Sequence, residues 1–150
     1  MIARKVRAAS EAGLTPLLCV GEETAAGASD GPRGSRPSAE AAAFVFGQIE
    51  AASGGDWELA ARLIVAYEPV WAIGAAEPAG AGYVSDVVRH LRARLAVHGL
   101  PELPIIYGGS AGPGLLPRLH GVSGLFLGRF AHDAANFGTV LDEALLRGGK

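Results

Sequence analysis

The stretch Leu63-Ile64-Val65-Ala66-Tyr67 is largely apolar and runs directly into Glu68-Pro69. Apolar and polar residues do not alternate in it, which is typical of a parallel strand covered on both faces rather than a half-exposed antiparallel strand. The proline disfavours helical geometry at Glu68, so we expect the strand to end there with the carboxylate at its carboxyl end.

The segments on either side of this strand alternate between helix and strand. Residues 22–38 are instead rich in glycine, serine, proline and alanine, which predicts an exposed loop with turns. Strict alternation requires parallel strands with right-handed crossovers, and therefore one domain built as α/β layers or as a closed (β/α) barrel. Ser38 is a predicted helix cap, and Gly13 and Gly54 are predicted helix ends. Helices are predicted over 2–12, 39–52, 83–98, 114–119 and 136–147, and strands over 14–20, 63–67, 104–107 and 125–127.

Composition favours a small-molecule site. The chain has 150 residues, 49% of them hydrophobic, and 13 basic against 15 acidic residues with neither sign in a long block. This balance argues against nucleic acid or an anionic membrane as a partner. No run approaches the roughly 20 apolar residues of a membrane span. The single cysteine, Cys19, gives no internal disulfide framework and fits a reducing, cytoplasmic compartment.

Candidate functional groups follow the carboxyl ends of the predicted strands, where a parallel sheet places its ligand site. Glu68 is placed to take a proton from carbon, although a strand-end glutamate in a salt bridge fits the same pattern. Residues 108–112, Gly-Gly-Ser-Ala-Gly, offer backbone N–H groups and one hydroxyl to a phosphate. A tight strand-to-helix connection explains these glycines equally well. Gly128 adds another N–H to the same anion if the two strands are neighbours.

The segment after Glu68 reads Pro-Val-Trp-Ala-Ile-Gly-Ala-Ala-Glu-Pro-Ala over residues 69–79. Trp71 and Ile73 are large apolar side chains in a predicted loop. Such a loop can close over a site and exclude water, with the flanking prolines confining its motion to two hinges. A loop packed permanently on the sheet is the alternative.

Three motifs resemble the triosephosphate isomerase family. Residues 66–74, Ala-Tyr-Glu-Pro-Val-Trp-Ala-Ile-Gly, are similar to the family's signature, and residues 107–110, Tyr-Gly-Gly-Ser, to its next strand-end motif. Residues 17–22, Leu-Leu-Cys-Val-Gly-Glu, resemble its fifth strand. The resemblance covers nearly the whole chain in the family's order. It implies a parallel (β/α) barrel of the TIM type with only the last four β/α units present, so that residues 1–150 form a partial domain from the fourth to the eighth helix.

The resemblance also implies a reaction. Glu68 would shuttle a proton between adjacent carbons of a phosphorylated ketose and aldose through an enediolate, as between dihydroxyacetone phosphate and glyceraldehyde 3-phosphate. Gly74, Ser110 and Gly128 would hold the phosphate. No cofactor, metal, nucleic acid or membrane is implied, and the reaction would belong to glycolysis and gluconeogenesis in the cytoplasm.

The same resemblance assigns the mobile lid, for which this family is itself a standard example. Glu22 would meet Trp71 when the lid shuts, and Tyr107 would steady the closed lid. The lid residues implied are Pro69, Val70, Trp71, Ala72 and Ile73.

Two departures from the family pattern bear on substrate. The usual Thr-Gly-Lys at the lid tip is Ala-Ala-Glu over residues 75–77, and the usual Gly-Gly after the last strand is Gly128-Arg129. The Arg129 guanidinium either binds the phosphate directly or points outward. In these two departures the chain resembles relatives of the family that act on four-carbon ketose phosphates. A substrate such as erythrulose phosphate is therefore the alternative.

The first four strands of the family's barrel have no counterpart here. With them go an Asn-Lys pair and an electrophilic histidine, and His90, His98, His120 and His132 do not match that histidine. The isolated chain is then expected to be a very poor isomerase, because such donors stabilise the enediolate charge. An open half barrel also favours self-association or completion by an amino-terminal half. A truncated piece, favoured by Met1 at the start of a helix, and a non-catalytic half-barrel or assembly partner are the remaining alternatives.

Overall fold

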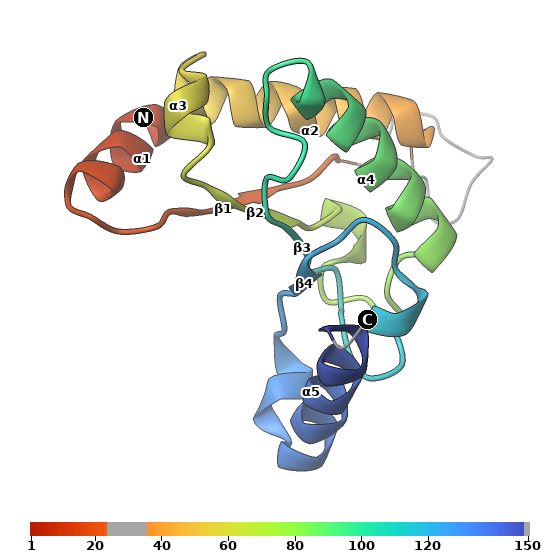
Figure 1. The fold of residues 1–150 in the computed structure, drawn as a ribbon. Helices are drawn as coiled ribbons and strands as arrows, with labels where there is room; N and C mark the ends of the chain where they lie inside the picture. Colours follow the sequence, from red (N-terminus) through yellow and green to blue (C-terminus); the bar gives the residue numbers. More distant parts are fainter. Residues whose placement is uncertain (24–35, 149–150) are drawn as a thin grey trace.

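A parallel sheet organises the computed structural model, which describes residues 1–23 and 36–148 (Figure 1). Its four strands are β1 (Leu17–Val20), β2 (Ile64–Tyr67), β3 (Ile105–Tyr107) and β4 (Gly124–Leu125), in that order across the sheet. Every neighbouring pair is parallel. The carboxyl ends of all four strands therefore meet along one edge. The parallel sheet predicted from sequence is confirmed.

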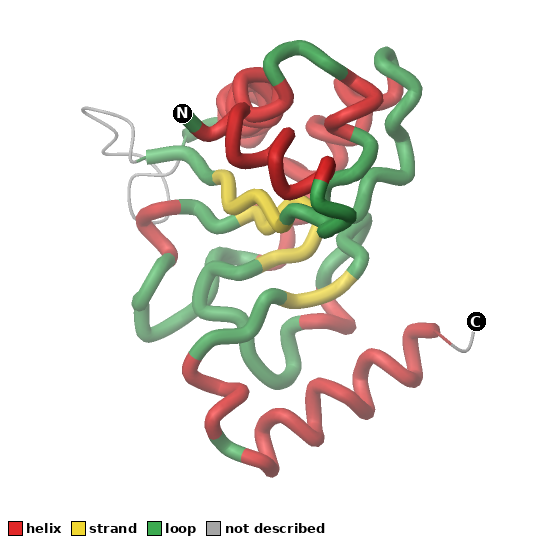
Figure 2. Tube along the Cα trace, turned by 90° about the vertical axis from the view of Figure 1, so that its left-hand side faces the viewer, coloured by secondary structure: helices red, strands yellow, loops and turns green. Residues whose placement is uncertain are grey.

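Helices connect these strands. The α-helices are α1 (Ile2–Glu11), α2 (Ser38–Ser53), α3 (Trp57–Ala60), α4 (Ala81–Ala96) and α5 (Ala134–Gly148). Short 3-10 turns are η2 (Val70–Ala72), η3 (Leu116–Arg118) and η4 (Arg129–His132). In Figures 1 and 2 the helices α2 and α4 lie together on one face of the sheet, and α5 lies at its far end beyond β4. No helix in the described ranges is long and apolar enough to cross a membrane.

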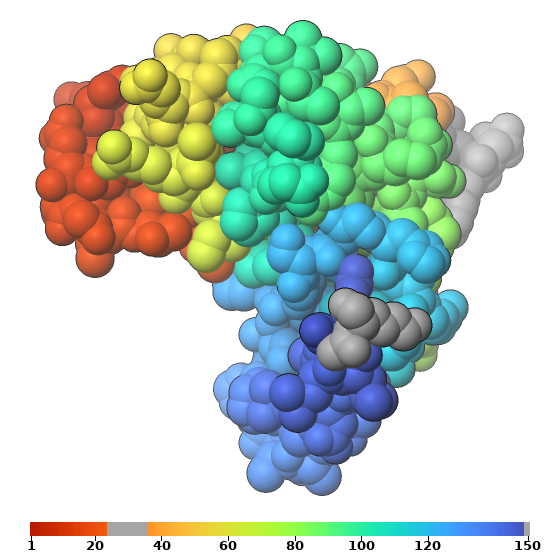
Figure 3. All heavy atoms as spheres, viewed as in Figure 1, coloured from red at the N-terminus to blue at the C-terminus, as the bar shows by residue number. Residues whose placement is uncertain are grey.

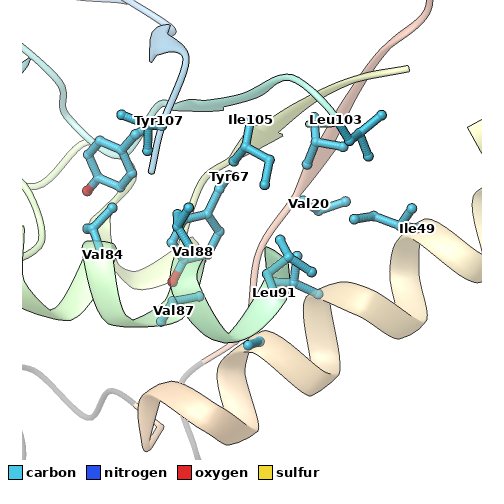
Figure 4. Close-up of a cluster of buried hydrophobic side chains, with 14 of the residues drawn as sticks. Val20, Ile49, Tyr67, Val84, Val87, Val88, Leu91, Leu103, Ile105 and Tyr107 are labelled. Atoms are coloured by element: carbon cyan, nitrogen blue, oxygen red, sulfur yellow. The ribbon is translucent and has the colours of Figure 1, made fainter. Parts of the chain in front are cut away.

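The core lies between the sheet and helices α2 and α4 (Figure 4). Val65 and Ile105 from the strands, Ile49 from α2 and Leu91 from α4 are all fully buried there. The apolar residues of α4 recur at helical spacing, so one stripe of the helix faces the strands. This packing fixes the strand ends that carry the candidate site.

The other face of the sheet is not covered by any described helix. Along β1, Leu18 and Val20 are buried, whereas Leu17 is 43% exposed and Cys19 is exposed. In Figure 3 the carboxyl-terminal residues project away from the body formed by the earlier part of the chain. Helices outside and an uncovered inner strand face are the arrangement of half of a (β/α) barrel, as the sequence predicts.

Several local expectations need correction. Ser38 is the first residue of α2 and not its cap, because Pro37 takes the cap position without a side-chain hydrogen bond. The helix α3 was not expected; it spans only one turn and is capped by Asp56, whose carboxylate accepts from the Leu59 N–H at 3.0 Å. The helix predicted over 114–119 is only the 3-10 turn η3, which begins next to a proline.

Strand and loop boundaries also differ in places. β1 begins at Leu17 rather than Leu14, because Leu17 is the first residue with a partner on β2. Gly54 does end α2, in a left-handed conformation with φ of 67°. Most of the loop predicted over residues 22–38 lies outside the described residues.

Candidate active site

Glu68 lies at the carboxyl end of β2, between the ends of its two neighbours. Its backbone N–H donates to the Val20 carbonyl at 2.8 Å, and the Gly108 N–H donates to the Tyr67 carbonyl at 2.9 Å. Both bonds continue the strand ladders up to the site, so the backbone at Glu68 is held from either side. Within the described residues Glu68 forms no ion pair, and the salt-bridge alternative gains no support.

The half-buried side chain of Glu68 rests on Gly108. A Cβ atom at position 108 would lie 2.7 Å from the Glu68 carboxyl carbon and 2.9 Å from its Oε2 atom, closer than such atoms approach. Glycine at 108 therefore creates the space in which the carboxylate lies. Gly21 has a similar role on the other side, because a Cβ there would collide with the Glu68 carbonyl.

One pocket of about 290 Å³ unites Glu68 with the residues expected to hold a phosphate. In the described part of the chain, the backbone N–H groups of Gly74, Ser110 and Gly128 have no hydrogen-bond acceptor. Unpaired N–H groups around a pocket are suited to an anion. The structure thus brings Glu68, Gly74, Ser110, Gly128 and Arg129 together, with Ile73, Gly108, Ala111, Phe126 and Leu127 completing the lining.

Ser110 connects this pocket to the segment expected to form the lid. It has a left-handed backbone with φ of 52°, which is uncommon for a residue with a side chain. Its hydroxyl lies 2.9 Å from both the Ala72 and the Ala75 carbonyls. The hydroxyl is therefore bonded to the segment expected to form the lid, whereas the backbone N–H of Ser110 has no acceptor among the described residues.

The lid segment is held at both ends. Near its start, the Trp71 indole N–H donates to Glu22 Oε1 at 3.2 Å. At its end, the Ala79 N–H donates to the Tyr107 hydroxyl at 3.0 Å, and that hydroxyl donates to the Gly109 carbonyl at 2.8 Å. These are the two contacts that the sequence resemblance implied for a shut lid.

The remaining lid residues differ in exposure. Pro69 and Ala72 are buried, Val70 is 50% exposed, and Ile73 is 57% exposed while lining the pocket. The buried members attach the segment to the sheet, and the exposed members lie on its outer side and over the pocket.

Glu22 is a buried hub that accepts hydrogen bonds from three aromatic side chains. Its carboxylate is fully buried, and its Oε1 atom accepts from Tyr67 at 3.2 Å and from Tyr83 at 2.9 Å as well as from Trp71. Burial, followed by the negative charge of Glu22, raises the pKa of both tyrosines. Sequence reasoning missed Tyr67 and Tyr83 as members of this hub. A phenol in the first turn of the helix after the lid was the only local signal.

Gln48 of α2 is a second residue that sequence reasoning missed. Its side-chain amide pairs with the backbone of Gly21 in both directions, since the Gly21 N–H donates to Oε1 at 2.9 Å and Nε2 donates to the Gly21 carbonyl at 3.2 Å. The pair anchors the end of β1 beside Glu68. A glutamine within a helical apolar stripe was the available signal.

Arg129 lines the pocket, and its guanidinium is hydrogen-bonded to the segment expected to form the lid. Its Nη2 atom donates to the Ala75 carbonyl at 2.7 Å and to the Ala76 carbonyl at 3.2 Å. The guanidinium therefore contacts the lid tip while its residue lines the pocket.

Cys19 lies on the uncovered inner face of β1, close enough to Glu68 for the carboxylate to affect the pKa of the thiol. Partial burial, then hydrogen bonding to and the charge of Glu68, raise the pKa of the thiol to about 11. The thiol is therefore protonated at neutral pH.

All four histidines lie in the described residues, and none of them lines the pocket. His98, His120 and His132 are exposed, and His90 is half-buried. The His98 ring also stacks on Trp57, with 3.9 Å between ring centroids. Within the described residues no group of three or more histidine, cysteine, aspartate or glutamate residues is placed to bind a metal ion.

Comparison with known proteins gives this geometry a family. The family model described as triosephosphate isomerase matches residues 1–144. The chain belongs to the triosephosphate isomerase family. Its four-stranded parallel sheet is thus part of a TIM-type barrel, as the sequence motifs predicted.

Similar curated proteins include some named L-erythrulose-1-phosphate isomerase and some named triosephosphate isomerase. The chain is 47% identical to L-erythrulose-1-phosphate isomerase of Pectobacterium atrosepticum, over 95% of this chain and 52% of that protein. It is 35% identical to probable triosephosphate isomerase 2 of Listeria monocytogenes, over 93% of this chain and 54% of that protein. The chain is also 38% identical to L-erythrulose-1-phosphate isomerase of Rhizobium etli, over 91% of this chain and 50% of that protein. The chain spans about half the length of these relatives.

Proposed function

We propose that this chain supplies the base and the phosphate site of an isomerase acting on short phosphorylated sugars. Glu68 takes a proton from one substrate carbon and returns it to the adjacent carbon through an enediolate. The observation that supports this most is one pocket shared by the Glu68 carboxylate and three backbone N–H groups that have no acceptor among residues 1–23 and 36–148. A phosphate bound there places the sugar carbons beside the carboxylate.

The lid contacts support the same reaction. The segment after Glu68 is anchored by Trp71 at its start and by Ala79 at its end. A lid closed over an enediolate excludes water and prevents its side reactions. Glu68 and the lid are adjacent in sequence, so closure and positioning of the base are linked.

The test is solvent deuterium exchange at the substrate carbon, followed by NMR. The chain is assayed alone and mixed with the half of the Pectobacterium isomerase that it does not match. Loss of a general base costs about 10²–10⁴-fold, so Glu68→Gln is expected to lower exchange by at least about 100-fold. Exchange that is unchanged in Glu68→Gln contradicts the proposal. No exchange under either condition favours a non-catalytic half-barrel.

The substrate is proposed to be a triose phosphate or a four-carbon ketose phosphate. The 47% identity to an L-erythrulose-1-phosphate isomerase favours the four-carbon substrate, and so does the Gly128-Arg129 departure. The matches to relatives named triosephosphate isomerase support the triose phosphate as the other candidate substrate. Measuring kcat/KM for both substrates in the complemented protein decides between them, and at least tenfold preference for the triose contradicts the four-carbon assignment.

We also propose that the uncovered inner sheet face is completed by another chain segment, either an amino-terminal half or a second copy. Leu17 is 43% exposed, Phe126 is 37% exposed, and both are apolar. Burying such surfaces is favourable by about 25 cal/mol for each Å² removed from water. Sedimentation equilibrium with and without the complementing half tests this proposal; a lone monomer that binds no such half contradicts it.

A further inference from the structure

Arg129 joins two parts of the pocket that are far apart in sequence. Its Nη2 atom lies 2.7 Å from the Ala75 carbonyl and 3.2 Å from the Ala76 carbonyl. A terminal guanidinium nitrogen carries two hydrogens, so each carbonyl can take one. Charged donors make stronger hydrogen bonds than neutral ones. The turn after β4 is thereby fastened to the lid tip.

The orientation of the guanidinium is supported by Phe130. The central guanidinium carbon lies 5.2 Å from the centre of the Phe130 ring, within the range of a cation–π contact. The ring in turn packs on Gly112, where a Cβ atom would lie 2.7 Å from the ring carbon Cδ2. A glycine, an aromatic ring and the arginine therefore form one stack behind the lid tip.

Other contacts do not replace this fastening. Trp71 and Ala79 hold the two ends of the lid, not its tip. The Ser110 hydroxyl is within reach of the Ala75 carbonyl at the tip and of the Ala72 carbonyl before it, but its single proton can bond only one at a time. In the described part of the chain, Arg129 is the one charged donor bonded to the tip.

We propose that Arg129 is a positioning residue that latches the lid tip, residues 75–76, to the turn after β4. The latch holds the N–H of Gly74, on the lid, near the N–H of Gly128, on that turn. Both groups are assigned to the phosphate, so phosphate binding and the latched tip reinforce each other. This inference rests on the proposed function for the role of the lid, but the contacts themselves do not.

Hydrogen exchange followed by mass spectrometry tests the latch in the 150-residue chain. Peptides covering 69–79 are compared in the native chain, Arg129→Lys and Arg129→Gln. Lysine keeps the charge but lacks the planar guanidinium that stacks on the Phe130 ring and is oriented by it. Exchange in the lid peptides is expected to rise about tenfold in Arg129→Gln and to rise measurably in Arg129→Lys. Arg94→Gln, an exposed arginine on α4, is the matched control and leaves lid exchange unchanged.

Peptides from α2 in the same samples serve as the internal reference. A rise in the lid peptides no larger than the rise in α2 overturns the latch, because it reports loss of stability throughout the chain. A lid rate equal to that of the native chain in Arg129→Gln also overturns it.

Inorganic phosphate then tests the coupling. Saturating phosphate is expected to slow lid exchange at least about threefold in the native chain and to have little effect in Arg129→Gln. Equal protection in both chains overturns the coupling. Because hydrogen exchange needs no turnover, failure of the Glu68→Gln assay and failure of the latch remain separate results.

Discussion

The substitution Gly108→Ala is expected to displace the Glu68 carboxylate while destabilising the fold only slightly. The added Cβ atom would overlap the Glu68 Cγ atom and would lie 2.7 Å from the Glu68 carboxyl carbon, whereas ordinary contact begins near 3.4 Å. The carboxyl carbon must therefore move by at least about 0.7 Å. A displacement of about 1 Å can cost about 100-fold in rate, so we expect a loss of about 30- to 100-fold in carbon-proton exchange.

The cost in stability is expected to be smaller. The Glu68 side chain is only half-buried, so rotation about its Cα–Cβ bond can carry Cγ and the carboxylate away from the new methyl group. Inserting a methyl group into a packed site typically costs about 1–3 kcal/mol, and a movable neighbour places this site at the lower end. Urea unfolding measures that free energy on the same samples that are assayed for exchange.

Gly47→Ala is the matched control. Gly47 is an exposed glycine within α2, and a Cβ there meets nothing within 4 Å. Alanine is expected to stabilise the helix by about 0.5–1 kcal/mol without changing exchange at the substrate carbon. Gly108→Ala activity within twofold of the native chain would refute the placement of the carboxylate over Gly108.

Three further results are expected. Besides burial, the Glu68 carboxylate raises the pKa of Cys19, and Glu68→Gln removes its charge. Alkylation of Cys19 by iodoacetamide at pH 8 should therefore become several-fold faster. An unchanged rate would contradict the contact between these two side chains. The pKa of Tyr107 is raised to about 12, mainly by burial, and those of the other two tyrosines are also raised, so the free energy of unfolding should decline as pH rises above about 10, the unfolded value. Absorbance at 295 nm should show phenolate only as the chain unfolds, and phenolate in the folded chain at pH 10.5 would contradict this. Gln48→Leu leaves the buried N–H and carbonyl of Gly21 without partners and should cost about 2 kcal/mol in urea unfolding, with a cost below about 0.5 kcal/mol arguing against the clamp.

The fold class follows from patterns that are local in sequence. The apolar run ending at Glu68-Pro69 becomes β2, and each flanking helix appears where apolar residues recur at helical spacing. Boundaries were less predictable because they depend on partners. Leu14 has no partner on β2, and its N–H donates to the Ala9 carbonyl at the end of α1, so it lies outside β1. The single turn of α3 is too short to show a period.

The pocket was predictable in outline because parallel strands gather their carboxyl ends at one edge. Knowing that Glu68 and Ser110 follow strands is enough to expect them together. The links between elements were not predictable, since Tyr83 reaches Glu22 across 61 positions and Arg129 reaches Ala75 across 54. Such contacts depend on how a helix or a loop packs, and no local spacing encodes them.

The measurement that bears most directly on the shared pocket is an NMR titration with inorganic phosphate. The backbone amide signals of Gly74, Ser110 and Gly128 and the carboxyl carbon signal of Glu68 are followed together. We expect all four to shift with one dissociation constant, since one anion site touches them all. Shifts confined to other residues, or a Glu68 signal that does not respond while the three amides do, would contradict a base and a phosphate site that serve the same substrate.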